Sequence, residues 1–97
     1  MRLTFDNPEL EILFHDSNAR TRYSKAIVKA FRQLIARVID ATNENHLRDL
    51  KGLHFEKLKG RKGEYSMRLN KQFRLIVTIE SASGGNVLHI LDIEDYH

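Results

Sequence analysis

The chain has 97 residues, enough for one small domain with a limited core. Hydrophobic residues make up 41% and charged residues 30% of the sequence, which is typical of a folded globular protein rather than a disordered one. The lack of cysteine excludes a disulfide framework, a thiol nucleophile and Cys-ligated zinc or iron–sulfur sites. No apolar run is long enough for a membrane span or a signal peptide, so we expect a cytoplasmic protein with no membrane partner.

The first part of the chain predicts a short strand and two helices. The first five residues alternate between polar and apolar side chains, as a strand does. Asn7 as the capping residue and Pro8 at the first helical position predict a short helix that ends near His15. After a polar loop at Asp16–Arg22, apolar residues recur every three or four positions over about Ser24–Ala41, which predicts a long amphipathic helix.

The hydrophobic period becomes strand-like in the second half. Thr42–Gly60 has no sustained period and is expected to be a loop with one helical turn. Apolar and polar residues alternate over Tyr65–Asn70 and Phe73–Glu80, which predicts two strands. Ser81–Gly85 has the composition of a turn, and Val87–Ile93 predicts a further strand. We therefore expect an α+β fold, with N-terminal helices packed on one face of a small antiparallel β-sheet.

Charge is unevenly distributed along this second half. From Lys57 to Arg74 there are seven cations and one anion, whereas Leu75–His97 contains four anions and no lysine or arginine. A cationic stretch beside an acidic one suggests a phosphate-binding surface next to elements that balance its charge. The alternative is that these cations only solvate a loop and a hairpin.

Two arginines of the predicted hairpin are expected to be neighbours. If Asn70–Gln72 form a three-residue loop, Arg68 lies opposite Arg74 on the face away from the main core; a two-residue loop would change this register. Like charges in such positions repel by a few tenths to about 1 kcal/mol unless an anion lies between them. The alternative to a phosphate site is that the two arginines extend into water or pair with Glu80 or Asp92.

The antiparallel meander is expected to bring the last residues of the chain to the same edge. Arg68 and Arg74 would then lie near Asp95, Tyr96 and His97. Arginines neutralise a phosphate in its transition state, and a histidine that titrates near neutrality can move a proton. This set is suited to phosphodiester chemistry and holds too few ligands for a metal. The alternative for His97 is a frayed, solvent-exposed residue.

Three segments and their order carry a resemblance to a known family: Phe55–Gly60, Tyr65–Leu75 and Asp92–His97. With their Leu-Lys-Gly, Ser-x-Arg-x-Asn-x-x-aromatic-Arg and Asp-Tyr-His motifs, they resemble the HigB-type toxins, or plasmid-maintenance killer proteins, of the RelE/ParE superfamily. The resemblance is carried by motifs from about Asp40 to His97, and by length and pattern before that. It implies a RelE-like, microbial RNase-like fold and a single toxin domain over residues 1–97.

The resemblance also implies an activity and its residues. The implied protein is a type II toxin that cleaves messenger RNA on the ribosome by metal-independent general acid/base chemistry, without a cofactor. Matching motif to motif, the catalytic set is Lys59, Arg68, Arg74, Tyr96 and His97, with Asp95 in support. In this set the arginines and Lys59 stabilise the phosphate or the leaving group, Tyr96 contacts the RNA, and His97 is the acid or the base. The other cations expected at the RNA are Lys57, Arg61, Lys62 and Lys71.

Two positions depart from the family pattern. Glu56 stands where some members have a histidine, which places more of the proton transfer on His97. Phe73 stands where a tryptophan is usual, and we expect this change to affect packing only.

The partners implied are a cognate helix-turn-helix antitoxin of the HigA type, the ribosome and mRNA, with operator DNA bound only through the antitoxin complex. Two other functions remain open: a ParE-like non-enzymatic inhibitor of a topoisomerase, which would share the fold, and a plain RNA-binding module. The paired arginines and Tyr96-His97 favour the nuclease, because a protein-binding toxin needs no titrating group among phosphate ligands.

Overall fold

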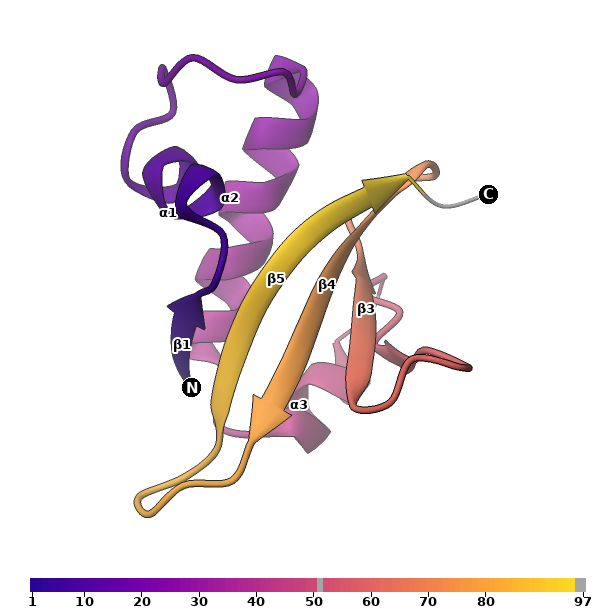
Figure 1. Cartoon of the computed structure of the whole chain (residues 1–97). Coiled ribbons are helices and arrows are strands. Elements are labelled where there is room, and N and C mark those ends of the chain that lie inside the picture. The colour runs from indigo at the N-terminus through magenta and orange to yellow at the C-terminus, as the bar shows by residue number, and fades with distance from the viewer. Residues whose placement is uncertain (51, 96–97) are drawn as a thin grey trace.

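The computed structural model describes residues 1–50 and 52–95, in which a strand and three helices precede four further strands (Figure 1). The first half contains β1 (Arg2–Phe5), α1 (Pro8–His15), α2 (Lys25–Asp40) and α3 (Glu44–Asp49). The second half contains β2 (Glu56–Lys57), β3 (Glu64–Arg68), β4 (Phe73–Glu80) and β5 (Val87–Asp95). None of the helices in these ranges is both long enough and apolar enough to cross a bilayer.

The described strands form one sheet in the order β1-β5-β4-β3-β2. Strands β2 to β5 are antiparallel neighbours, which confirms the predicted meander. The prediction of a purely antiparallel sheet was wrong at one edge, because β1 pairs with β5 in parallel, Arg2 opposite Val87. Parallel neighbours need a long crossover, and here every other element lies between the two strands in the chain. The sheet is therefore mixed.

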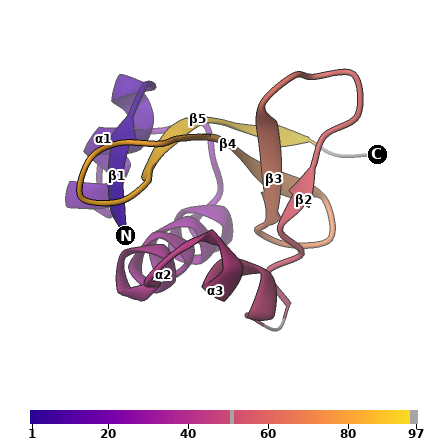
Figure 2. The same ribbon diagram turned by 90° about the horizontal axis from the view of Figure 1, so that it is seen from below.

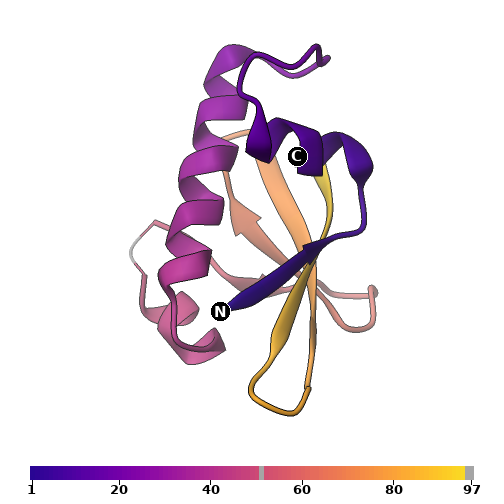
Figure 3. The same cartoon turned by 90° about the vertical axis from the view of Figure 1, so that its left-hand side faces the viewer.

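Helices cover one face of the sheet and leave the other to the loops. Figure 3 shows α1 and α2 in front of the same face, and Figure 2 shows α2 and α3 below the sheet. The predicted helix starts are confirmed: the Asn7 side chain accepts a hydrogen bond from the Glu9 backbone, and the Ser24 side chain accepts one from Ile27. The turn predicted within Thr42–Gly60 is α3, which Asn43 caps.

The main core lies between these helices and the sheet. Phe31 and Ile35 of α2 are completely buried, as are Leu75, Val77 and Ile90 on the facing side of β4 and β5. Complete burial of such side chains stabilises the fold by roughly 1.5–3 kcal/mol each. The helix face of the sheet is thereby fixed, and alternation along the strands places the residues between these on the outer face.

Candidate active site

A short turn sets the register of the hairpin that carries the two arginines. The side-chain oxygen of Asn70 accepts hydrogen bonds from the backbone N–H groups of Gln72 at 2.8 Å and Phe73 at 2.7 Å. This arrangement closes a three-residue turn, in which an asparagine side chain takes the place of a backbone carbonyl. Arg68 lies directly opposite Arg74 as a result, which confirms the predicted register.

A bulge in β5 determines which of its side chains face outward. Ile76 lies opposite Asp92 but Val77 lies opposite Ile90, so Leu91 is the extra residue. Beyond an inserted residue, each side chain of the strand points to the face opposite the one that regular alternation would give it. The bulge thus keeps Ile93 in the core and turns the next residue, Glu94, to the outer face.

The outer face consequently consists of short cross-strand rows from β3, β4 and β5. The middle row is Ser66, Ile76 and Asp92, and the row nearest the turn is Arg68, Arg74 and Glu94. Figure 1 shows that this last row lies at the end of the sheet where the β3–β4 turn and the end of β5 meet. An anion is therefore part of the arginine row, opposite Arg74.

Both arginines of this row are partly buried. The Arg68 side chain donates from Nε to the Asn70 carbonyl at 3.3 Å, and the Nη1 atom of Arg74 is buried. Among the nearby acids, Glu80 approaches Nε2 of His89 at 3.1 Å, and Asp92 accepts a hydrogen bond from the backbone of Ile93. Two guanidinium groups on one sheet face provide donors in the geometry that phosphate oxygens accept.

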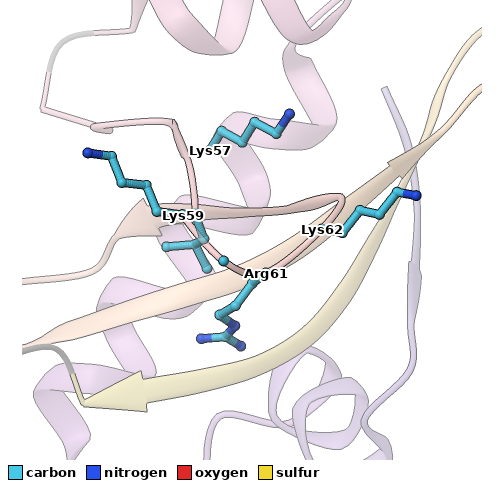
Figure 4. A pocket seen from close by; sticks show the side chains of 6 residues that line it. Lys57, Lys59, Arg61 and Lys62 are labelled. Atoms are coloured by element: carbon cyan, nitrogen blue, oxygen red, sulfur yellow. The ribbon is translucent and has the colours of Figure 1, made fainter.

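The loop between β2 and β3, residues 58–63, is called the lysine loop and carries three of the predicted cations, Lys59, Arg61 and Lys62. Figure 2 shows this loop on the side of the sheet away from α2 and α3. Gly60 and Gly63 have φ values of +74° and +75°, a backbone conformation that other residues rarely adopt. The loop and Lys57 border a pocket of about 640 Å³, and Figure 4 shows Lys57, Lys59 and Lys62 extending away from Arg61 in different directions.

Arg61 connects this loop to the arginine row. Its Nη1 and Nη2 atoms each lie 2.7 Å from a carboxylate oxygen of Glu94, and Nη2 also lies 2.7 Å from Glu64. Hydrogen bonding from Arg61 lowers the pKa of Glu94 below its ordinary value, and hydrogen bonding to Glu94 raises the pKa of Arg61. The sequence predicts Arg61 as an RNA contact, and in the folded chain its guanidinium is held by two acids.

The remaining predicted residues lie around the same end of the sheet or beyond the described residues. Lys71 is exposed in the β3–β4 turn, and Asp95 lies opposite Phe73, where it accepts a hydrogen bond from the Gln72 side chain at 3.0 Å. Tyr96 and His97 fall outside the described residues. The structure thus places Arg68 and Arg74 in one row with Glu94, which Arg61 of the lysine loop contacts.

Sequence reasoning missed the residues that position this site. Asn70 left a usable signal, because an asparagine at the first position of a short loop between two strands often closes the turn with its side chain. The pairing of Arg61 with Glu94 joins residues 33 positions apart and left no local signal. The two-residue strand β2 was also missed, since it is too short to show alternation.

The comparison with known families identifies the chain. The family model described as HigB-like toxin, a RelE-like toxin of type II toxin–antitoxin systems, matches residues 3–97. The chain belongs to this family. It is thus a HigB-like toxin of the RelE superfamily, as the motifs of its second half predict.

Solved structures of related toxins share the architecture of this HigB-like toxin. The YoeB/ParE toxin from Agrobacterium tumefaciens aligns over 100% of both chains with a TM-score of 0.63 and 16% sequence identity, a likeness that shows the fold alone. The YoeB-YefM complex from Staphylococcus aureus aligns over 100% of this chain and 97% of that chain, with a TM-score of 0.58 and 25% identity. No curated protein matches the sequence. The predicted RelE-like α+β fold is confirmed.

Proposed function

We propose that this HigB-like toxin is an endonuclease that cleaves messenger RNA during translation on the ribosome. The observation that carries the proposal is the row of Arg68 and Arg74 on the outer face of the sheet, to which Arg61 ties the lysine loop through Glu94. Two guanidinium groups side by side on one sheet face offer positive charge and forked N–H donors. A phosphate of the RNA backbone is an anion of suitable charge and shape.

The chemistry that this set supports is cleavage by the RNA's own 2′-hydroxyl. The 2′-oxygen attacks the adjacent phosphorus as its proton passes to a base, and the 5′-oxygen leaves with a proton from an acid. Arg68 and Arg74 neutralise the charge that develops on the phosphorane oxygens. Lys59 stabilises the phosphate or the leaving group. His97 acts as the acid or the base.

Exposed residues around this set hold the RNA in place. Lys62 lies in the lysine loop with Lys59, Lys57 immediately precedes that loop, and Lys71 lies in the β3–β4 turn. These lysines contact backbone phosphates, which position the RNA without reading its sequence. Tyr96 stacks on a base or donates a hydrogen bond near the 2′-hydroxyl, and Asp95 supports the end of the site.

The toxin works with a cognate antitoxin. The family is described by its place in type II toxin–antitoxin systems, and one similar structure is that of a YoeB-YefM complex. We infer a helix-turn-helix antitoxin of the HigA type that holds the toxin inactive and through which the complex binds operator DNA. The toxin's other partners are the ribosome and mRNA in the cytoplasm.

A ParE-like inhibitor of a topoisomerase is the main competing function. The similarity to a YoeB/ParE toxin at 16% identity fits either activity, because it shows the fold alone. The arginine row favours the nuclease, since a protein-binding toxin has no need for paired phosphate ligands. A plain RNA-binding module would use the same cations without cleaving the RNA.

Induction of the chain in bacteria tests these functions against one another. We expect growth arrest with loss of full-length mRNA, and the same cleavage in a reconstituted translation system. Arg74→Ala should fold but lose cleavage by about 30-fold to 1,000-fold, which corresponds to the 2–4 kcal/mol typical of a preorganised charge ligand. Lys29→Ala, on the exposed face of α2, is the matched control.

Other outcomes would point elsewhere. Growth arrest with intact transcripts and inhibited DNA supercoiling would favour the ParE-like function. RNA binding without cleavage or arrest would favour the plain binding module. An unfolded Arg74→Ala protein would show that this arginine is structural.

A further inference from the structure

Arg61 differs from the other cations of its loop in how firmly it is held. Its bidentate contact with Glu94 and its ion pair with Glu64 all measure 2.7 Å. The side chains of Arg61 and Glu94 are still 40% and 39% exposed, and ion pairs at such sites contribute little to stability. A two-pronged contact with fixed carboxylates provides geometric specificity instead. The contact is therefore better suited to positioning than to stabilisation.

The two carboxylates lie on different strands and different rows of the outer face. Glu64 begins β3 and lies opposite Thr78, whereas Glu94 lies opposite Arg74 near the end of β5. The guanidinium of Arg61 must lie across the intervening row to meet both. Ile76, the middle residue of that row, is only 3% exposed although it faces away from the helices. Figure 4 shows Arg61 directed from its loop toward β5.

The same contact bears on Lys59, which lies two residues before Arg61 in the loop. The loop is closed by hydrogen bonds from the Leu58 N–H to the Glu64 carbonyl at 2.9 Å and from the Glu64 N–H to the Arg61 carbonyl at 3.1 Å. These bonds shape the loop but attach it to β3 alone. The Arg61–Glu94 contact attaches it to β5 as well.

We propose that Arg61 is a positioning residue, which acts through Glu94 to hold the lysine loop at the arginine row. The expected effect on RNA cleavage rests on the proposed nuclease function, whereas the attachment of the loop to β5 does not. Arg61 thus need not contact RNA to be required for cleavage. A displacement of a catalytic group by about 1 Å can reduce a rate on the order of a hundredfold.

Variants of the two partners test the proposal. Arg61→Gln, Glu94→Gln and the double variant are compared with Lys29→Gln, which removes one positive charge from the exposed face of α2. In ribosome-programmed mRNA cleavage, we expect each single variant to lose about 10-fold to 100-fold in kcat with little change in KM. The double variant should be no worse than Arg61→Gln alone, because residues that act through one contact are not additive.

A direct RNA contact predicts a different pattern. Arg61→Gln would then raise KM and reduce the salt dependence of RNA binding, and Glu94→Gln would leave cleavage unchanged or improved. This pattern, or additive losses in the double variant, would overturn the proposal. Melting temperatures close to that of the wild type show that a loss does not arise from unfolding.

Hydrogen exchange separates this proposal from the nuclease function. In the toxin without RNA, the amides of Leu58 and Glu64 should exchange faster in Arg61→Gln and in Glu94→Gln, and at the wild-type rate in Lys29→Gln. Unchanged exchange in Arg61→Gln would overturn the proposal. If the wild-type protein cleaves no RNA, the proposed function fails, and the exchange rates still decide whether Arg61 holds the loop.

Discussion

At the scale of single residues, one asparagine closes the turn that joins the strands carrying the two arginines. Asn70 provides one oxygen for two backbone N–H groups, and the turn it closes sets Arg68 opposite Arg74. The turn adds to the pairing register of β3 and β4 that their buried faces also favour. The residue contributes to the site without belonging to its charged set.

Replacement of this asparagine should loosen the hairpin. Asn70→Ala removes the acceptor of both hydrogen bonds, each of which contributes about 0.5–1.5 kcal/mol. We expect the free energy of unfolding to fall by about 1–2 kcal/mol in urea denaturation, and cleavage to fall with it. Asn70→Asp keeps an acceptor oxygen at the same place and should retain most of the stability. Equal losses in both variants would contradict the role of the oxygen.

The proposed proton transfer depends on a different residue, His97. His97→Gln keeps a polar side chain of similar size but cannot exchange a proton near neutral pH. We expect cleavage to fall by about 100-fold to 10,000-fold, the usual contribution of a general acid or base, while antitoxin binding and melting temperature stay unchanged. Cleavage near the wild-type rate would leave the catalysis to Lys59, Tyr96 and the arginines.

The sequence contains some of these residue-level relations and not others. The spacing of Arg68 and Arg74 around a possible three-residue turn was enough to predict their pairing, because turn length sets register in a hairpin. The contact of Arg61 with Glu94 was not predictable from spacing. It depends on how far the β2–β3 loop bends back over the sheet, which the hydrophobic pattern does not encode.

At the scale of elements, the β5 bulge decides which face carries the charges. Alternation in β5 holds for Leu88 and Ile90 and then changes phase, so that Ile93 is buried and Glu94 faces outward. The sequence predicted a strand here from its branched residues, but the change of phase concealed its register. The long helix α2 was easier to predict, because its period continues through four turns.

Removal of the bulge should leave the pairing of β5 intact. Deleting Leu91 lets Asp92 follow Ile90 directly, so that Ile93 stays in the core and Glu94 stays opposite Arg74. We expect this variant to fold with a modest change in melting temperature. One alanine inserted between Asp92 and Ile93 instead turns Ile93 outward and Glu94 toward the core, and we expect a large drop in melting temperature and loss of toxicity. Equal melting temperatures for the two variants would contradict the assignment of Leu91 as the extra residue.

At the scale of the whole molecule, the Arg61–Glu94 contact makes stability depend on pH. The pKa of Glu94 lies below its ordinary value of 4.5 in the folded state, through the hydrogen bonds from Arg61. A carboxyl whose pKa is lowered on folding stabilises the protein above its unfolded pKa, and this contribution is lost as the pH falls through the folded pKa. The protein therefore loses this stabilisation only in acid.

Urea denaturation between pH 3 and pH 7 measures this effect. The difference in unfolding free energy between the wild type and Glu94→Gln should be largest above about pH 4.5 and should shrink as the pH falls below it. Glu56→Gln, an exposed glutamate of β2, changes the same charge and should follow the wild-type curve in parallel. A Glu94→Gln difference that does not vary with pH would contradict the ionic contact.

The parallel pairing of β1 with β5 has a consequence for how the toxin is made. Residues in contact across this pair, such as Thr4 and His89, lie 85 positions apart in the chain. During translation, β1 therefore cannot pair until β5 has also been synthesised. At about 5–20 residues per second, several seconds of synthesis separate the two. Glu94, which anchors the lysine loop, is also made after every other residue of that contact. The nascent chain consequently cannot assemble the proposed nuclease site while β5 is still inside the ribosome that is translating it.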